Sequence, residues 1–221
     1  DGYQSGFVIA TRAWPNRGVS EPSGETVIRG SREGFTETIR FNTALVRRRI
    51  RDPKFRVKPM TLGVRSKSDV AIMYIEDIVN PGVLRATIEE LQKIKLDAIL
   101  DSGYIQSYFE RNTLSPFPQV QSTERPDVVA AALYEGRVAI IVDNSPFAII
   151  VPATLVNLFQ SPDDYYQRSI YGSITRFIRV IAVLLSVLLP AFYIAVTSFS
   201  PSIIPSKLAY SIAASREGVP F

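Results

Sequence analysis

The chain contains neither cysteine nor histidine among its 221 residues, and these two absences remove the commonest enzyme chemistry. Without cysteine it forms no disulfide and no thiolate metal site. Without histidine it lacks the most frequent general base and the most frequent metal ligand. A Ser-His-Asp triad and a histidine-bound zinc are both excluded, so any catalysis would depend on carboxylates, lysine or tyrosine. We therefore expect a protein that is not an enzyme and needs no cofactor.

The chain also lacks a strong excess of charge of one sign. Lysine and arginine number 25 and aspartate and glutamate 21, which gives a net charge of +4. This mild surplus does not call for nucleic acid as a partner, but it suits a protein that lies beside anionic membrane lipid. The chain begins at Asp1 without a signal-peptide pattern, and we expect it to be an internal piece of a longer protein.

One stretch has no charge at all and is long enough to cross a bilayer. The 20 residues Val180–Phe199 read VIAVLLSVLLPAFYIAVTSF. As a helix they span about 30 Å, the thickness of the hydrocarbon core. Arg168, Arg176 and Arg179 precede this run, and the first charge after it is Lys207. The positive-inside rule then predicts that the part of the chain before the span is cytoplasmic.

Pro190 lies near the middle of the predicted span. A proline there is either a tolerated kink or a membrane hinge, because it removes one hydrogen bond of the helix. Residues 200–221 are interrupted by Pro201 and Pro205 and are either a loop or the start of another membrane segment.

The residues before the span show the mixed pattern of an α/β domain. We predict an incomplete first α/β subdomain with a basic helix (1–58), a second α/β subdomain (59–160), a juxtamembrane helix and transmembrane span (161–199), and the final segment (200–221). Helices are expected over 31–52, 81–94, 102–111, 126–135 and from 161 onward. Strands are expected over 6–13, 61–65, 70–75, 98–100, 138–142 and 147–151.

Two charged motifs are candidates for contacts between subdomains or subunits. The first is the run Arg47, Arg48 and Arg49 at the end of the basic helix, where cations also interact well with the helix dipole. It suits a solvated helix end, anionic lipid or an acidic partner. The second motif is Glu124-Arg125-Pro126-Asp127 at the start of a helix. Its carboxylates suit helix capping with a local ion pair, or a docking surface.

Several segments together resemble the A subunits of spore germinant receptors, the GerA family. These segments contain REGFTE (32–37), RRR (47–49), TERPD (123–127), EGRVAIIVDNSPFA (135–148) and the junction from PDDYY (162–166) to LLPAFY (188–193). The resemblance covers nearly the whole chain, and its strength lies in the combination of motifs.

The resemblance implies a cytoplasmic α/β region followed by membrane helices in the inner membrane of the spore. It also implies B and C receptor subunits as partners, assembly into a homo-oligomer, and ion conduction triggered by nutrients. Three alternatives stay open: a related spore membrane protein in dipicolinic acid release, a non-conducting membrane scaffold, and a membrane-anchored enzyme. The missing histidine and cysteine disfavour the last.

Overall fold

The computed structural model describes residues 18–27, 29–110, 115, 117–159, 166 and 169–199. The chain divides into two compact units, Asp1–Leu158 and Phe159–Phe221, which are described separately below. The predicted strand over 6–13, the predicted helix start at 161 and the segment 200–221 lie outside the described residues.

The first unit is built on a five-stranded sheet in the order β1-β2-β4-β5-β3, with every neighbouring pair antiparallel. The strands are β1 (Phe55–Leu62), β2 (Ser68–Ile75), β3 (Gln121–Thr123), β4 (Val138–Val142) and β5 (Ala148–Val151). All five residues of β4 are buried, as expected for an apolar central strand covered on both faces. The strands expected over 138–142 and 147–151 are confirmed as β4 and β5, which pair antiparallel as a hairpin.

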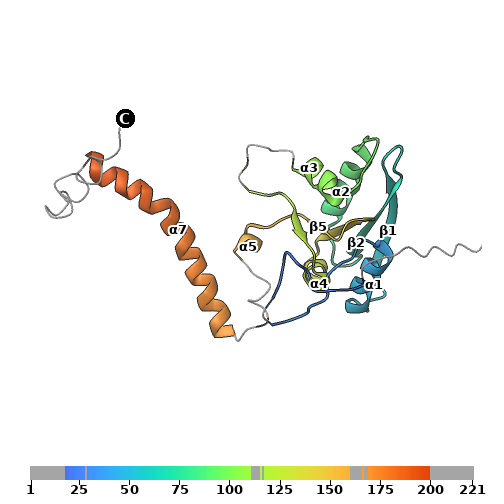
Figure 1. Ribbon diagram of the computed structural model, residues 1–221, viewed down its shortest axis with the longest axis horizontal. Helices are drawn as coiled ribbons and strands as arrows, with labels where there is room; N and C mark the ends of the chain where they lie inside the picture. The colour runs from blue at the N-terminus through green and yellow to red at the C-terminus, as the bar shows by residue number, and fades with distance from the viewer. Residues whose placement is uncertain are drawn as a thin grey trace, which may run out of the picture. The chain divides into compact units, whose positions relative to one another are not determined.

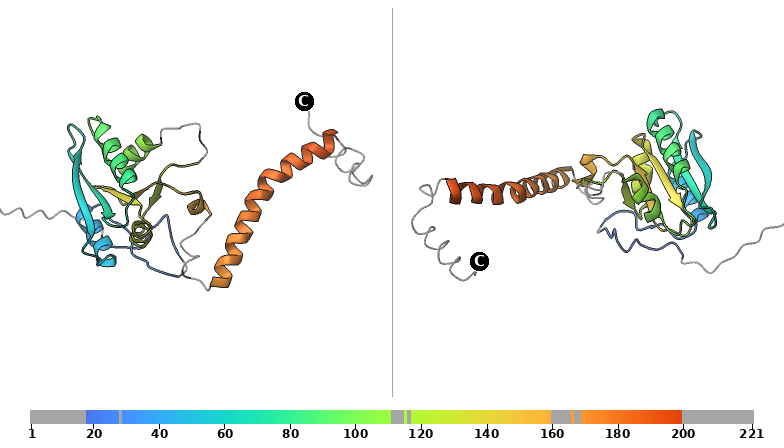
Figure 2. Two further views of the ribbon diagram at one scale, coloured as in Figure 1. Left: turned by 180° about the vertical axis from the view of Figure 1, so that it is seen from behind. Right: turned by 90° about the horizontal axis from the view of Figure 1, so that it is seen from above.

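Two helical layers cover the two faces of this sheet (Figure 1, Figure 2). Helices α1 (Ile39–Arg49) and α4 (Pro126–Tyr134) pack with each other, and their buried residues share one apolar cluster with the sheet. Helices α2 (Pro81–Lys93) and α3 (Ser102–Phe109) enclose a second cluster on the other face. The mixed α/β class predicted from the sequence is confirmed. The predicted subdomain boundary between residues 58 and 59 falls inside β1.

Local signals explain several helix ends. The side chain of Asn80 caps α2 by accepting from the Gly82 amide at 2.9 Å, with Pro81 in the first turn. Gly136 follows α4 with a φ of 80°, a left-handed conformation that glycine adopts without steric cost. Both features agree with the helices expected over 81–94 and 126–135.

Other elements differ from the prediction. The helix expected from Ser31 begins only at Ile39, because Gly34 and Phe35 donate their amides to Ser20 and Glu124 instead of to a helical turn. The strand expected over 61–65 is β1, which begins earlier and tolerates Pro59 because it lies at the edge of the sheet. Residues 98–100 form no strand, and β3, only three residues long, was missed.

The second unit contains α7 (Ser169–Phe199), a continuous helix of 31 residues with Pro190 in its interior. By length and composition it is suited to cross a membrane, and none of its apolar window is buried. Its only charged residues are Arg176 and Arg179, both before the apolar run. The predicted long apolar helix is confirmed.

Candidate functional site

The second charged motif forms a buried polar cluster at the start of α4. Arg125 is the residue before the helix, and its side chain is completely buried. Its NH2 group donates to Asp127 Oδ2 at 2.7 Å, and its NH1 group donates to the Glu25 carbonyl at 3.4 Å. The Nε atom finds no acceptor among the described residues. Arg125 therefore joins the start of α4 to a segment 100 residues earlier in the chain.

Two more carboxylates belong to this cluster. Thr123 Oγ1 donates to Glu25 Oε2 at 2.6 Å, and the Gly24 amide donates to Glu124 Oε2 at 3.4 Å. Burial raises the pKa of Glu25, against the opposing effect of hydrogen bonds from Thr123 and the Glu124 backbone. The Arg125 guanidinium thus pairs with the Asp127 carboxylate and acts electrostatically on the Glu25 carboxylate, and the removal of Arg125 would leave these two charges poorly compensated.

The first charged motif, the arginine run at the end of α1, contacts residues 31 and 33 of the chain segment that also contains Glu25. The Glu33 carboxylate accepts hydrogen bonds from the guanidinium groups of Arg48 and Arg49, the latter at 2.7 Å. Arg49 also donates to Ser31 Oγ at 2.8 Å. The hydrogen bond from Arg48, with further help from Arg49, lowers the pKa of Glu33. Arg47 takes no part in this contact and lies 5.8 Å from the centre of the Phe55 ring.

The two motifs therefore do not form one site, but both hold the same segment. We call residues 18–38 the strap; within it, residue 28 is outside the described part. The strap buries the apolar side chains of Val27 and Phe35, and it is also attached through the two charged clusters and through Thr36, whose amide donates to Asn42 Oδ1 in α1 at 2.8 Å. Of the six predicted contact residues, Arg48, Arg49, Glu124 and Arg125 contact the strap directly, and Asp127 supports Arg125.

Sequence reasoning missed a second polar centre, the turn between β4 and β5. Asp143 Oδ1 accepts from the Ile39 amide at 3.0 Å and so caps α1, for which Thr38 provides no side-chain cap. Ser145 is fully buried and its hydroxyl lies 2.9 Å from that of Ser102 at the start of α3. This turn thus fastens one helix from each layer to the sheet. The strands expected over 138–142 and 147–151 imply a short connection between them, but nothing in the sequence identified the helices that this turn contacts.

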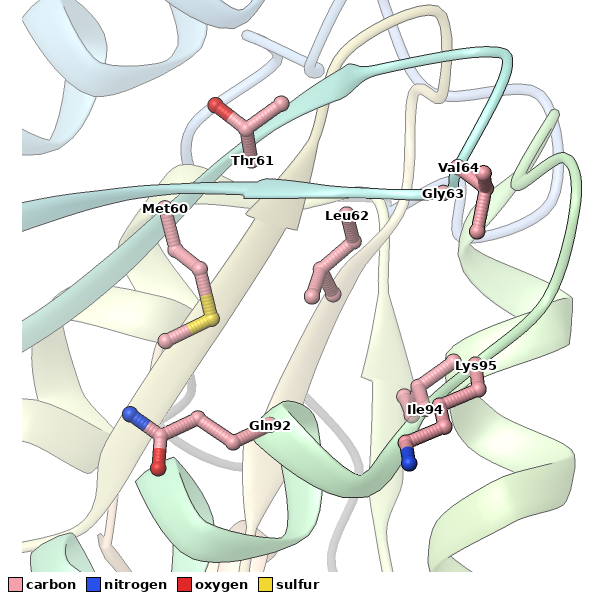
Figure 3. Close-up of a pocket in the computed structure, with 8 residues that line it drawn as sticks. All are labelled: Met60, Thr61, Leu62, Gly63, Val64, Gln92, Ile94 and Lys95. Carbon is pink, nitrogen blue, oxygen red and sulfur yellow. The ribbon is translucent and has the colours of Figure 1, made fainter.

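A pocket of about 380 Å³ lies between the end of β1 and the end of α2. Figure 3 shows Met60 and Leu62 extending from the strand toward Gln92, whereas Thr61 points to the opposite side. The pocket lining contains no carboxylate and no buried polar side chain, so it specifies no ligand chemistry. Among the described residues no group of three carboxylates is placed to hold a metal ion.

One protein family matches the chain over its whole length. The family model described as Bacillus/Clostridium GerA spore germination protein matches residues 1–221. The chain is 47% identical over 221 residues, which are 100% of this chain and 45% of the relative, to spore germination protein GerLA of Bacillus cereus. It is 42% identical over 221 residues, 100% of this chain and 43% of the relative, to the membrane protein YfkQ of Bacillus subtilis (strain 168).

A solved structure is also similar. It is the crystal structure of the N-terminal domain of the A subunit of the Bacillus megaterium spore germinant receptor GerK3, 46% identical with a TM-score of 0.45. The match covers 55% of this chain and 97% of that chain. The chain belongs to the GerA family of spore germination proteins, as its motifs predicted. It spans less than half the length of the two curated relatives.

Proposed function

We propose that this chain is part of a germinant-receptor A subunit, a non-enzymatic membrane protein of the inner spore membrane. In this proposal α7 crosses the bilayer and the first unit lies on the cytoplasmic side. The complete protein assembles as a homo-oligomer with B and C subunits and conducts ions when a nutrient is sensed. The observation that carries the proposal is α7, whose unburied apolar surface is long enough for a bilayer, in a chain that belongs to a spore germination family.

The physical argument for the span is that a bilayer removes the apolar surface of this helix from water. Between Val180 and Phe199 every side chain is uncharged, and leaving such a helix in water would expose a large apolar surface. Arg176 and Arg179 at the start of the run support a cytoplasmic first unit by the positive-inside rule. Pro190 supplies a position at which the helix can bend, and we assign it the role of a membrane hinge.

The charged clusters supply the contacts within this mechanism. Arg125 and Asp127 hold the strap inside the first unit. Arg48 keeps a side-chain exposure of 57% and, with Arg47 and Arg49, presents positive charge that suits a neighbouring subunit. A ligand bound elsewhere shifts such an assembly only by binding one arrangement more tightly than the other.

Ion flux tests the proposal directly. The complete protein, co-reconstituted with its B and C subunits in liposomes, is expected to release monovalent cations when nutrient is added. Spores that lack the gene are expected to lose the response to the same nutrient. Full response in such spores, or liposomes that stay tight, would refute the receptor function.

The orientation has its own test. A protease-cleavable tag placed before α7 is expected to stay protected in intact cells and to become cleavable in inverted vesicles. Cleavage in intact cells would contradict a cytoplasmic first unit.

Two other functions predict different results. A non-conducting scaffold would be needed for receptor assembly but would leave liposomes tight. A related protein of dipicolinic acid release would affect the loss of dipicolinic acid while nutrient sensing stays intact. Nucleotide or phosphoester turnover by the purified chain would favour a membrane-anchored enzyme.

A further inference from the structure

The short helix α5 (Leu155–Leu158) presents two adjacent large apolar side chains to solvent. Leu155 is 60% exposed and Val156 is 59% exposed. Nearby, the amide of Ala153 donates to the carbonyl of Gln119 at 2.9 Å, and Phe117, two residues before Gln119, is 58% exposed. The start of α5 and this neighbouring segment thus combine three bulky apolar side chains on the surface of the first unit.

The exposed side of α5 is held in place by a partly buried polar contact on its other side. Asn157 Nδ2 donates to Gln121 Oε1 at 2.8 Å, and the same oxygen accepts from Arg137 NH1 at 2.9 Å. The Arg137 side chain is only 10% exposed and also pairs with Glu135 at 2.7 Å. Because Asn157 is anchored to the sheet, Leu155 and Val156 are kept facing outward.

The sequence around α5 carries no charge. From residue 144 to residue 162 there is no aspartate, glutamate, lysine or arginine, and the flanking charges are Asp143 and Asp163. Desolvation of charged side chains is the main cost of bringing a protein surface into the boundary between lipid headgroups and acyl chains. This stretch avoids that cost, and its exposed side chains are of the kind that such a boundary accepts.

The chain also limits how far α5 lies from α7. Ten residues, 159–168, lie between Leu158 and Ser169, and the eleven Cα–Cα steps between these two residues reach at most about 40 Å when extended. The apolar surface is therefore tethered within that distance of the helix proposed to cross the bilayer. A tether of this length keeps the local concentration of bilayer surface around α5 high.

We propose that α5 docks on the membrane surface, with Leu155 and Val156 inserted at the headgroup boundary and Phe117 beside them. This inference rests on the proposed function, because it requires α7 to lie in the bilayer. The docking gives the first unit a second attachment to lipid besides the covalent tether. It restricts the rotation of that unit relative to the bilayer.

Tryptophan quenching tests the docking in the full chain. The chain has one tryptophan, Trp14, so the background is Trp14→Phe. Single tryptophans are introduced as Val156→Trp, as Val64→Trp, which is the same substitution at a valine 65% exposed in the β1–β2 turn, and as Leu188→Trp within α7. Each variant is reconstituted in phosphatidylcholine vesicles with and without bromine on the upper part of the acyl chains, and circular dichroism checks its fold.

The expected result is a blue-shifted emission and about twofold quenching at position 156, little effect at position 64, and burial in lipid at position 188. Quenching at 188 without quenching at 156 would overturn the docking and leave the membrane span intact. A blue shift at 156 without bromine quenching would mean contact with protein, such as a second copy, and would also overturn it. Equal quenching at 64 and 156 would show non-specific adsorption, and no quenching at 188 would refute the proposed function itself. Leu155→Trp repeats the measurement if Val156→Trp perturbs α5.

Discussion

The buried guanidinium of Arg125 is expected to carry a large part of the stability of the first unit. Replacement by methionine keeps the length and apolar stem but removes the charge that faces Asp127 at 2.7 Å and the donor to the Glu25 carbonyl. Removing one partner of a buried ion pair costs about 3–5 kcal/mol. Since the Asp127 side chain keeps an exposure of 16%, part of its charge is solvated, and we expect about 3 kcal/mol.

Urea denaturation followed by pulse proteolysis measures this cost. With a slope of about 2 kcal/mol per molar urea, a loss of about 3 kcal/mol lowers the midpoint by about 1.5 M. Trypsin adds a local readout, because the strap contains Arg32, and its cleavage should become faster below the unfolding range. Arg125→Lys keeps the charge but loses the planar guanidinium, so its urea midpoint is expected to lie between those of the parent and Arg125→Met.

The matched control is Arg65→Met. The Arg65 side chain is 85% exposed and lies 3.9 Å from Asp97, so the same substitution should cost less than about 0.5 kcal/mol. If Arg125→Met shifted the midpoint no more than Arg65→Met, and tryptic cleavage of the strap stayed slow, the role assigned to the buried cluster would be wrong.

Three further predictions concern single contacts. Glu33→Gln should destabilise the first unit by less than about 1 kcal/mol at neutral pH, since solvent screens this partly exposed group. Because the pKa of Glu33 is lowered from 4.5, the stability it contributes is present above that pH and lost as the pH falls through the folded-state pKa, so the stabilities of variant and parent should converge in acid. Gly136→Ala should cost about 1–3 kcal/mol in a urea titration, because the φ of 80° is strained for alanine and the new Cβ would lie 2.7 Å from the Ile78 carbonyl; Gly18→Ala, with open space around it, is the control. Asp143→Ala should cost about 1 kcal/mol and increase amide exchange in the first turn of α1, and unchanged exchange there would show that the cap is not needed.

Elements with local signals were predictable from the sequence. The apolar runs of β2, β4 and β5 stand between turn residues. Asn80 caps the start of α2 by accepting from Gly82, two residues later, and Gly136 ends α4 by its left-handed backbone conformation. The same holds for α7, where the absence of charge over 20 residues is visible without any partner.

The start of α1 was not predictable, for a reason that lies outside the helix. Phe35 fits the apolar spacing of the helix and is indeed 2% exposed, but it is buried as part of the strap. Its amide bonds to Glu124, and the first turn is capped by Asp143, residues about 90 and 100 positions away. Helical spacing identifies which side chains are buried, but it does not show that another segment has taken the backbone groups.

The charged motifs were recognised, yet their roles depend on a partner that sequence spacing does not reveal. Arg48 and Arg49 follow the rule for cations at a helix end, but their partner is Glu33 in the strap. The local pair expected between Arg125 and Asp127 is present at 2.7 Å, but the buried Arg125 also donates to the Glu25 carbonyl, 100 residues earlier in the chain. In both cases a nearby explanation existed, and only the fold shows the distant contact.

The strap links the two helices that cover one face of the sheet. It contacts the last turn of α1 through Glu33 and the first turn of α4 through Glu25, and these helices also pack against each other. Apolar burial of Val27 and Phe35 favours a docked strap in any state, whereas the charged contacts depend on where each partner lies. A movement of the strap would therefore act on α1 through Glu33 and the Thr36–Asn42 hydrogen bonds, and on the start of α4 through Arg125. Under the proposed function, the loss of Arg125 is therefore expected to impair the nutrient response even in a variant whose stability is restored elsewhere.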